Sequence, residues 1–64
     1  MKQAFKHGQV VRVKAYGGEV LEKRVVIDLG RSVVVCVEQE YARAQREGKE
    51  PNGVGFPKRD VEAV

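Results

Sequence analysis

The chain has 64 residues, of which 42% are hydrophobic and 33% are charged, and its formal net charge is +3. These proportions exclude a disordered chain, and the length allows one domain that buries only about 60% of its unfolded surface, so we expect modest stability unless partners add buried area. Twelve Lys and Arg stand against nine Asp and Glu, a mild excess that permits nucleic-acid binding without demanding it.

The N-terminal residues and the single cysteine exclude several classes of protein. Residues 1–7 lack the apolar stretch of a signal peptide, and no apolar run approaches the ~20 residues that span a bilayer, so we expect a cytoplasmic protein without membrane contact. Cys36 could recruit only His7 as a further soft ligand, so we expect no metal site. Because Cys36 lies in the apolar run 33–37, it is predicted to be a buried small hydrophobe rather than a reactive thiol.

Residues 9–16 are predicted to form the first strand, since apolar and basic side chains alternate there. Gly17-Gly18 then predicts a tight turn. Residues 19–29 form the expected second strand, with a bend or bulge near Lys23-Arg24 because Lys23 breaks the apolar parity. One face of this strand is expected to carry Leu21, Val25, Ile27 and Leu29.

Gly30-Arg31 predicts a type II′ turn that leads into a third strand over residues 32–37. A two-residue turn places Ile27 opposite Val34, and a three-residue turn would shift the pairs but leave both faces of the hairpin apolar. One face must line the core, so the other needs a cover, either a helix or another molecule. We expect this second face to consist of Val26, Val33, Val35 and Val37.

Residues 38–47 predict a short helix, because acidic residues open it, arginines close it and Gly48 can cap it. About ten residues are too few for a stable isolated helix, so Tyr41 is expected to dock over the third-strand face. A loop over 49–53, a strand over 54–56 ended by Pro57, a single 3₁₀ turn over 58–60 and a closing strand over 61–64 complete the chain.

This order of elements resembles that of SH3-like barrels over residues 8–64. The resemblance is closest in Gly8-Gln9-Val10-Val11-Arg12-Val13 and in Val54-Gly55-Phe56-Pro57-Lys58-Arg59-Asp60-Val61. It implies a mainly β domain over 8–64, a five-stranded SH3-like barrel with one short α-helix between strands three and four, preceded by an N-terminal extension over 1–7.

Within this class, KOW-like and Tudor-like domains bind nucleic acid or protein tails. Phe5, Tyr16, Tyr41 and Phe56 are scattered, so no aromatic cage for methyl-lysine is expected. The plasmid-encoded type II dihydrofolate reductases are similar in length and layout and act as tetramers around a shared pore. Their Val-Gln-Ile-Tyr motif would fall near residues 54–57, where Gln, Ile and Tyr are absent, so this oligomeric enzyme is the least favoured alternative.

Catalytic machinery is not expected. Ser32, Cys36 and His7 assemble no convincing triad, and the dispersed glycines form no phosphate loop, so no catalytic or cofactor-binding residues are predicted.

Two binding hypotheses remain, and we favour a non-catalytic module that contacts protein, either itself or another chain. Its candidate interface residues are Val26, Val33, Val35, Val37 and Tyr41. The alternative is a nucleic-acid surface built from Arg12, Lys14, Lys23, Arg24, Arg31, Lys58 and Arg59.

Overall fold

A tight hairpin around Gly30 joins the second and third strands of the molecule. The computed structural model describes residues 4–64, apart from the side chain of Tyr16. Strands β2 (Val20–Asp28) and β3 (Ser32–Cys36) are antiparallel, and the Leu29 N–H donates to the Ser32 carbonyl at 2.9 Å. Gly30 has φ 93°, which a residue with a Cβ rarely adopts, as expected for a glycine in this turn. The sequence left turns of two and three residues open, and the pairing of Asp28 with Val33 gives the two-residue form.

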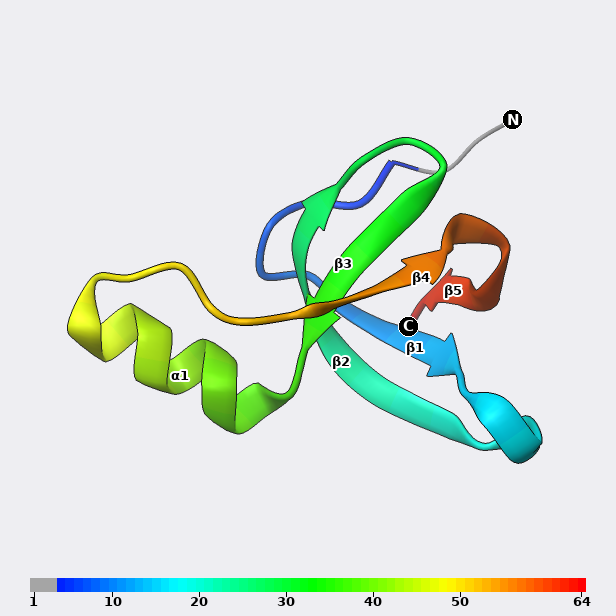
Figure 1. The fold of residues 1–64 in the computed structure, drawn as a ribbon, viewed down its shortest axis with the longest axis horizontal. Coiled ribbons are helices and arrows are strands. Elements are labelled where there is room, and N and C mark those ends of the chain that lie inside the picture. The colour runs from blue at the N-terminus through cyan, green and yellow to red at the C-terminus, as the bar shows by residue number, and fades with distance from the viewer. Residues whose placement is uncertain (1–3) are drawn as a thin grey trace.

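Five antiparallel strands form one sheet in the order β4-β3-β2-β1-β5, with β1 at Val10–Lys14, β4 at Val54–Pro57 and β5 at Val61–Ala63 (Figure 1). The predicted turns are present as 3₁₀ segments at Tyr16–Gly18 and Lys58–Asp60. Over residues 4–64, the ladder ends at β4 on one side and β5 on the other, with no pairing between them. The prediction of a mainly β chain is therefore confirmed, with an open sheet.

The single predicted helix is present as α1 (Glu38–Glu47). Gly48 ends it in the left-handed conformation with φ 66°, as expected for a C-terminal cap. Arg43 reaches Glu40 at 2.6 Å and Glu47 at 3.0 Å, so the helix carries ion pairs along its own surface. Figure 1 shows α1 to one side of the sheet, joined to β3 by a short connection and to β4 by a longer loop over residues 48–53.

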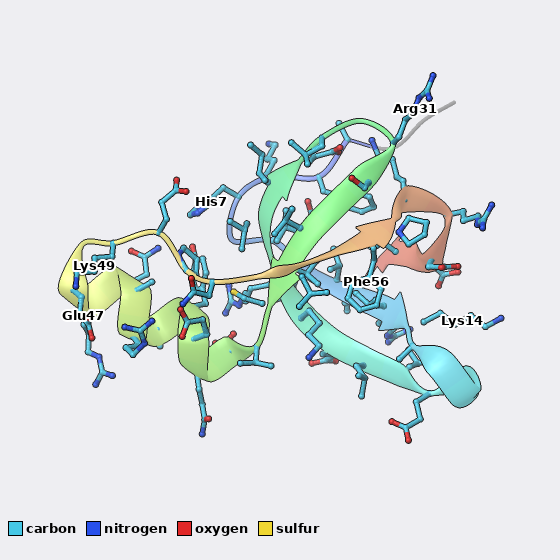
Figure 2. All side chains as sticks on the ribbon, viewed as in Figure 1. His7, Lys14, Arg31, Glu47, Lys49 and Phe56 are labelled. Atoms are coloured by element: carbon cyan, nitrogen blue, oxygen red, sulfur yellow. The ribbon has the colours of Figure 1, made fainter. Side chains whose placement is uncertain are left out.

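The core is built from valines on one face of the sheet. Its buried members are Phe5, Val11, Val13, Val25, Val33, Val35 and Val61. Phe56 of β4, labelled in Figure 2, packs against this cluster. In the register of β3 and β4 it pairs with Val33. The alternation predicted for the first strand is confirmed, because Val11 and Val13 are fully buried while Arg12 and Lys14 are exposed.

The expected position of the bulge was wrong. The register between β2 and β3 shifts between Val25 and Ile27, rather than near Lys23-Arg24. One extra residue in a strand moves each side chain after it to the opposite face of the sheet. Val25 therefore points into the core, whereas Ile27 points outward and is 50% exposed.

Residues 4–7 pack against the sheet instead of extending from it. Phe5 is buried in the core, and its N–H donates to Asp28 Oδ2 at 2.9 Å. The Gly8 N–H donates to the Val25 carbonyl at 2.7 Å, which continues the pairing along β2. Residues 1–3 of the predicted extension lie outside the described residues.

Candidate interaction surface

Two rows of uncharged residues cross the outer face of the sheet, the face opposite the core. Register pairs Ile27 with Val34 and Val34 with Gly55, so the first row spans β2, β3 and β4. The second row lies beside it, because Leu29 bonds to Ser32 across the turn and Ser32 pairs with Pro57. We call this surface the outer hairpin face: Ile27, Leu29, Ser32, Val34, Gly55 and Pro57.

The outer hairpin face is open to solvent over much of its area. Ile27 is 50% exposed and Leu29 59%, while Val34 is half-buried and Gly55 and Pro57 are exposed. Large aliphatic side chains at these exposures, adjacent in two rows without a charge between them, form a patch rather than scattered apolar residues. A patch of this kind on a small sheet is typical of a contact surface.

Helix α1 does not cover this patch. Its Tyr41 contacts the middle of β2 and the N-terminal segment: the Arg24 guanidinium lies 5.3 Å from the Tyr41 ring centroid, and the His7 ring lies 5.6 Å away. Arg24 also pairs with Glu38 at 2.6 Å and donates to the Gly8 carbonyl at 2.7 Å. The expectation that Tyr41 docks over the third-strand face was therefore wrong, because an arginine and a histidine hold its ring elsewhere.

The predicted interface residues are distributed differently from the expectation. Val33 and Val35 are 0% and 2% exposed and belong to the core, so they present no surface. Val26 is the half-buried extra residue of the bulge, and Val37 is exposed at the start of α1. The second apolar face that the sequence predicted exists, but Ile27, Leu29 and Val34 form it.

The seven predicted nucleic-acid residues do not form one surface. Arg24 and Lys58 are engaged in intramolecular ion pairs with Glu38 and Asp28. Lys23 lies across from Val11, on the core side of the sheet. Figure 2 shows Arg31 beside the turn between β2 and β3, and Lys14 apart from it at the end of β1.

The remaining basic residues of the set lie beside acidic residues. Arg12, Lys14 and Arg59 line one shallow depression of about 100 Å³, which Asp60 and Glu62 also line. Arg12 has Glu22 across from it on one side and Glu62 on the other. Such a row of alternating charge offers little net attraction to a phosphate backbone.

A depression of about 290 Å³ lies between α1 and the segments beside it. His7, Tyr41, Ala44 and Gln45 line it together with residues 48–51. The Gln45 amide donates to the Tyr41 hydroxyl at 2.9 Å, so these two polar groups are already paired. Nothing in this depression has the nucleophile, base and orienting group of a catalytic site.

Within residues 4–64, no group of three or more His, Cys, Asp or Glu residues is placed to hold a metal ion. The described part of the chain also lacks a helix of the length and apolar character needed to cross a bilayer. Cys36 is buried, as predicted, and burial is the main cause that raises the pKa of its thiol.

Comparison with known proteins gives no relative for this chain. No protein-family model matches the sequence, and neither a curated protein nor a solved structure is significantly similar to it.

The sequence contained part of the signal for the outer hairpin face. The Gly30 turn fixes Ile27 opposite Val34, and this pairing is confirmed. Whether Ile27 and Val34 point toward the core or toward solvent depends on the bulge at Val26, and no residue type in this segment predicts a bulge there. Asp28 could also have predicted part of the packing. Its carboxylate lies on the core side of the sheet and therefore requires partners, which the Phe5 N–H and Lys58 provide.

Proposed function

We propose that this chain is a non-catalytic interaction module that binds protein through the outer hairpin face. The observation that carries the proposal is the pair of uncharged rows across β2, β3 and β4, with Ile27 and Leu29 half exposed or more. Burying such side chains against a partner removes apolar surface from water, which is the main favourable contribution in protein association.

A protein partner fits this surface better than a nucleic acid does. Nucleic-acid binding needs several unpaired cations on one surface, whereas the basic side chains here are separated, paired or flanked by carboxylates. The order of elements, including the 3₁₀ turn between β4 and β5, supports assigning the module to the SH3-like barrels. In that assignment the binding surface lies on the outside of the barrel, on the hairpin formed by β2 and β3.

Site-specific photocrosslinking in cells tests the proposal. A photoreactive phenylalanine replaces Leu29 in one variant and Val20 in a control, since Val20 is 60% exposed at the opposite end of β2. We expect position 29 to give a discrete, protease-sensitive adduct that position 20 does not give. Adducts from both positions alike, or a nuclease-sensitive adduct from position 29, would contradict a protein contact at this face.

A further inference from the structure

We infer that residues 4–7 form a strap that opens and closes on the sheet as a unit, with Asp28 as its latch, and that the closed strap orders the hairpin turn. The strap is defined by its own contacts within the chain. Its effect on binding rests on the proposed function, because the turn carries Leu29 and Ser32 of the outer hairpin face.

The strap is attached to the rest of the described chain at few points. Phe5 is buried, whereas the other three residues of the strap are exposed. The Phe5 N–H donates to Asp28, and the His7 ring lies beside Tyr41 with the centroids 5.6 Å apart. The N–H and carbonyl groups of Lys6 bond within a local turn. A segment with one buried side chain and so few bonds to its surroundings opens at a lower free energy than paired strands do.

Gly8 marks the end about which the strap moves. Its N–H donates to the Val25 carbonyl at 2.7 Å, and its carbonyl accepts from Arg24 at 2.7 Å, so the backbone is fixed from this residue onward. Its φ of 84° lies in the left-handed region, which glycine enters without a steric cost. Gly8 therefore suits a hinge, at which the chain before it turns while the chain after it stays bonded to β2.

The Asp28 carboxylate holds the strap closed and also holds the hairpin turn. Its Oδ2 accepts the Phe5 N–H and lies 2.9 Å from the Lys58 ammonium, while its Oδ1 accepts the Gly30 N–H at 2.8 Å. The Lys58 N–H in turn donates to the Arg31 carbonyl at 3.0 Å. The strap, the turn and the chain after β4 are therefore joined through one largely covered carboxylate.

The Phe5 ring lies beside this ion pair, with the Lys58 ammonium 5.8 Å from the ring centroid. When the strap opens, the Asp28 carboxylate loses one donor and the ion pair gains contact with water, which weakens the attraction between the two charges. The bonds of the turn at Gly30 and Arg31 then lose support. Opening of the strap and loosening of the turn are therefore coupled.

This coupling reaches the second row of the outer hairpin face. Leu29 follows Asp28 in the chain, and Pro57 precedes Lys58, so two members of the row are next to the latch. Ser32 joins them, because it pairs with Pro57 across β3 and β4. A closed strap keeps this row in one arrangement, and an ordered surface binds a partner at a lower entropic cost. The strap thus regulates binding at the face.

Native-state amide hydrogen exchange of the full chain, followed by NMR in low urea, tests the inference. We expect the Phe5 N–H to exchange through a small opening that urea barely affects, while the N–H groups of the paired strands β2 and β3 exchange by global unfolding. Asp28→Asn should speed the Phe5 exchange at least about tenfold, because a neutral amide oxygen accepts more weakly than a carboxylate. Glu62→Gln, the same change of charge at an exposed position of β5, should leave it unchanged.

Phe5→Ala separates the coupling from the latch, since Asp28 and Lys58 remain in place. It should speed the exchange of the Gly30 N–H. Val61→Ala, which shortens another buried core side chain, should lower the global stability without this effect on Gly30. A Phe5 N–H that exchanges only by global unfolding would overturn the inference, as would Asp28→Asn without effect on Phe5 or Phe5→Ala without effect on Gly30.

Phe5→Leu is the milder variant, and it keeps the coupling testable if Phe5→Ala does not fold. Exchange is measured on the isolated chain, so its outcome does not depend on a partner. The expected exchange pattern together with a failed crosslink from position 29 would support the strap and reject the proposed function alone.

Discussion

The Lys58 ammonium lies 2.9 Å from Asp28 Oδ2 and joins the start of the 3₁₀ turn after β4 to the end of β2. Both side chains are largely covered, at 13% exposure for Asp28 and 18% for Lys58. The same carboxylate accepts the N–H groups of Phe5 and Gly30. Asp28 therefore connects the N-terminal segment, the hairpin turn and the chain after β4.

These contacts make stability depend on acid pH. The Phe5 N–H first, and then Lys58 and the Gly30 N–H, lower the pKa of Asp28 from 3.8 to about 2. Because the folded pKa lies below the unfolded one, the contribution is complete above pH 3.8 and is lost as the pH falls toward 2. We expect the free energy of unfolding, from urea titrations followed by circular dichroism, to fall in this window. Asp28→Asn should be less stable at neutral pH and should show a shallower fall; equal slopes would contradict the role of Asp28.

The register of the hairpin predicts opposite effects for two aliphatic positions. Val33→Ala should lower the free energy of unfolding by about 2 to 3 kcal/mol, because Val33 is fully buried. Ile27→Thr should change it by about 0.5 kcal/mol or less in the isolated monomer, since Ile27 is half exposed and threonine keeps the β-branch. Urea unfolding at low protein concentration measures both. A larger loss for Ile27→Thr than for Val33→Ala would mean that the bulge at Val26 is misplaced.

Gly8 and Tyr41 should show strong coupling. Gly8 has φ 84°, and a Cβ there would collide with the Tyr41 hydroxyl oxygen. Gly8→Ala should therefore destabilise the fold by more than about 1 kcal/mol. In a Tyr41→Phe background the collision with the hydroxyl oxygen is removed, and the backbone cost and a close contact with ring Cζ at 3.2 Å remain, so Gly8→Ala should cost less there. A double-mutant cycle from thermal or urea unfolding measures the difference, and additive effects would exclude the contact.

Cys36 should react with a thiol reagent only when the fold opens. Its side chain is buried, and burial followed by the nearby Glu40 and Glu38 raises the pKa of the thiol, so little thiolate is available. We expect slow labelling by a disulfide reagent under native conditions and fast labelling in urea. Rapid labelling of the native protein in one phase would show that the α1 side of β3 is open.

The sequence by itself determined the elements and several of their contacts. The alternation at Val11 and Val13, the Gly30 turn, the helix over 38–47 with Gly48 as its cap, and the 3₁₀ turn after Pro57 are all local features. Each depends on residue type and spacing within a few positions, so each could be predicted from the chain and is confirmed.

Only the tertiary structure decided which face of the hairpin is inside and where the helix docks. Residues 33–37 are apolar at every position, so they carry no alternation, and a bulge at Val26 has no sequence mark. Val25 and Val33 turn inward because the core cluster can bury them together, and this places Ile27 and Val34 outside. Likewise, Tyr41 is held by Arg24 and His7, two residues remote in sequence. The position of the candidate surface follows from these non-local contacts. Its apolar character could be predicted from the sequence of the hairpin alone.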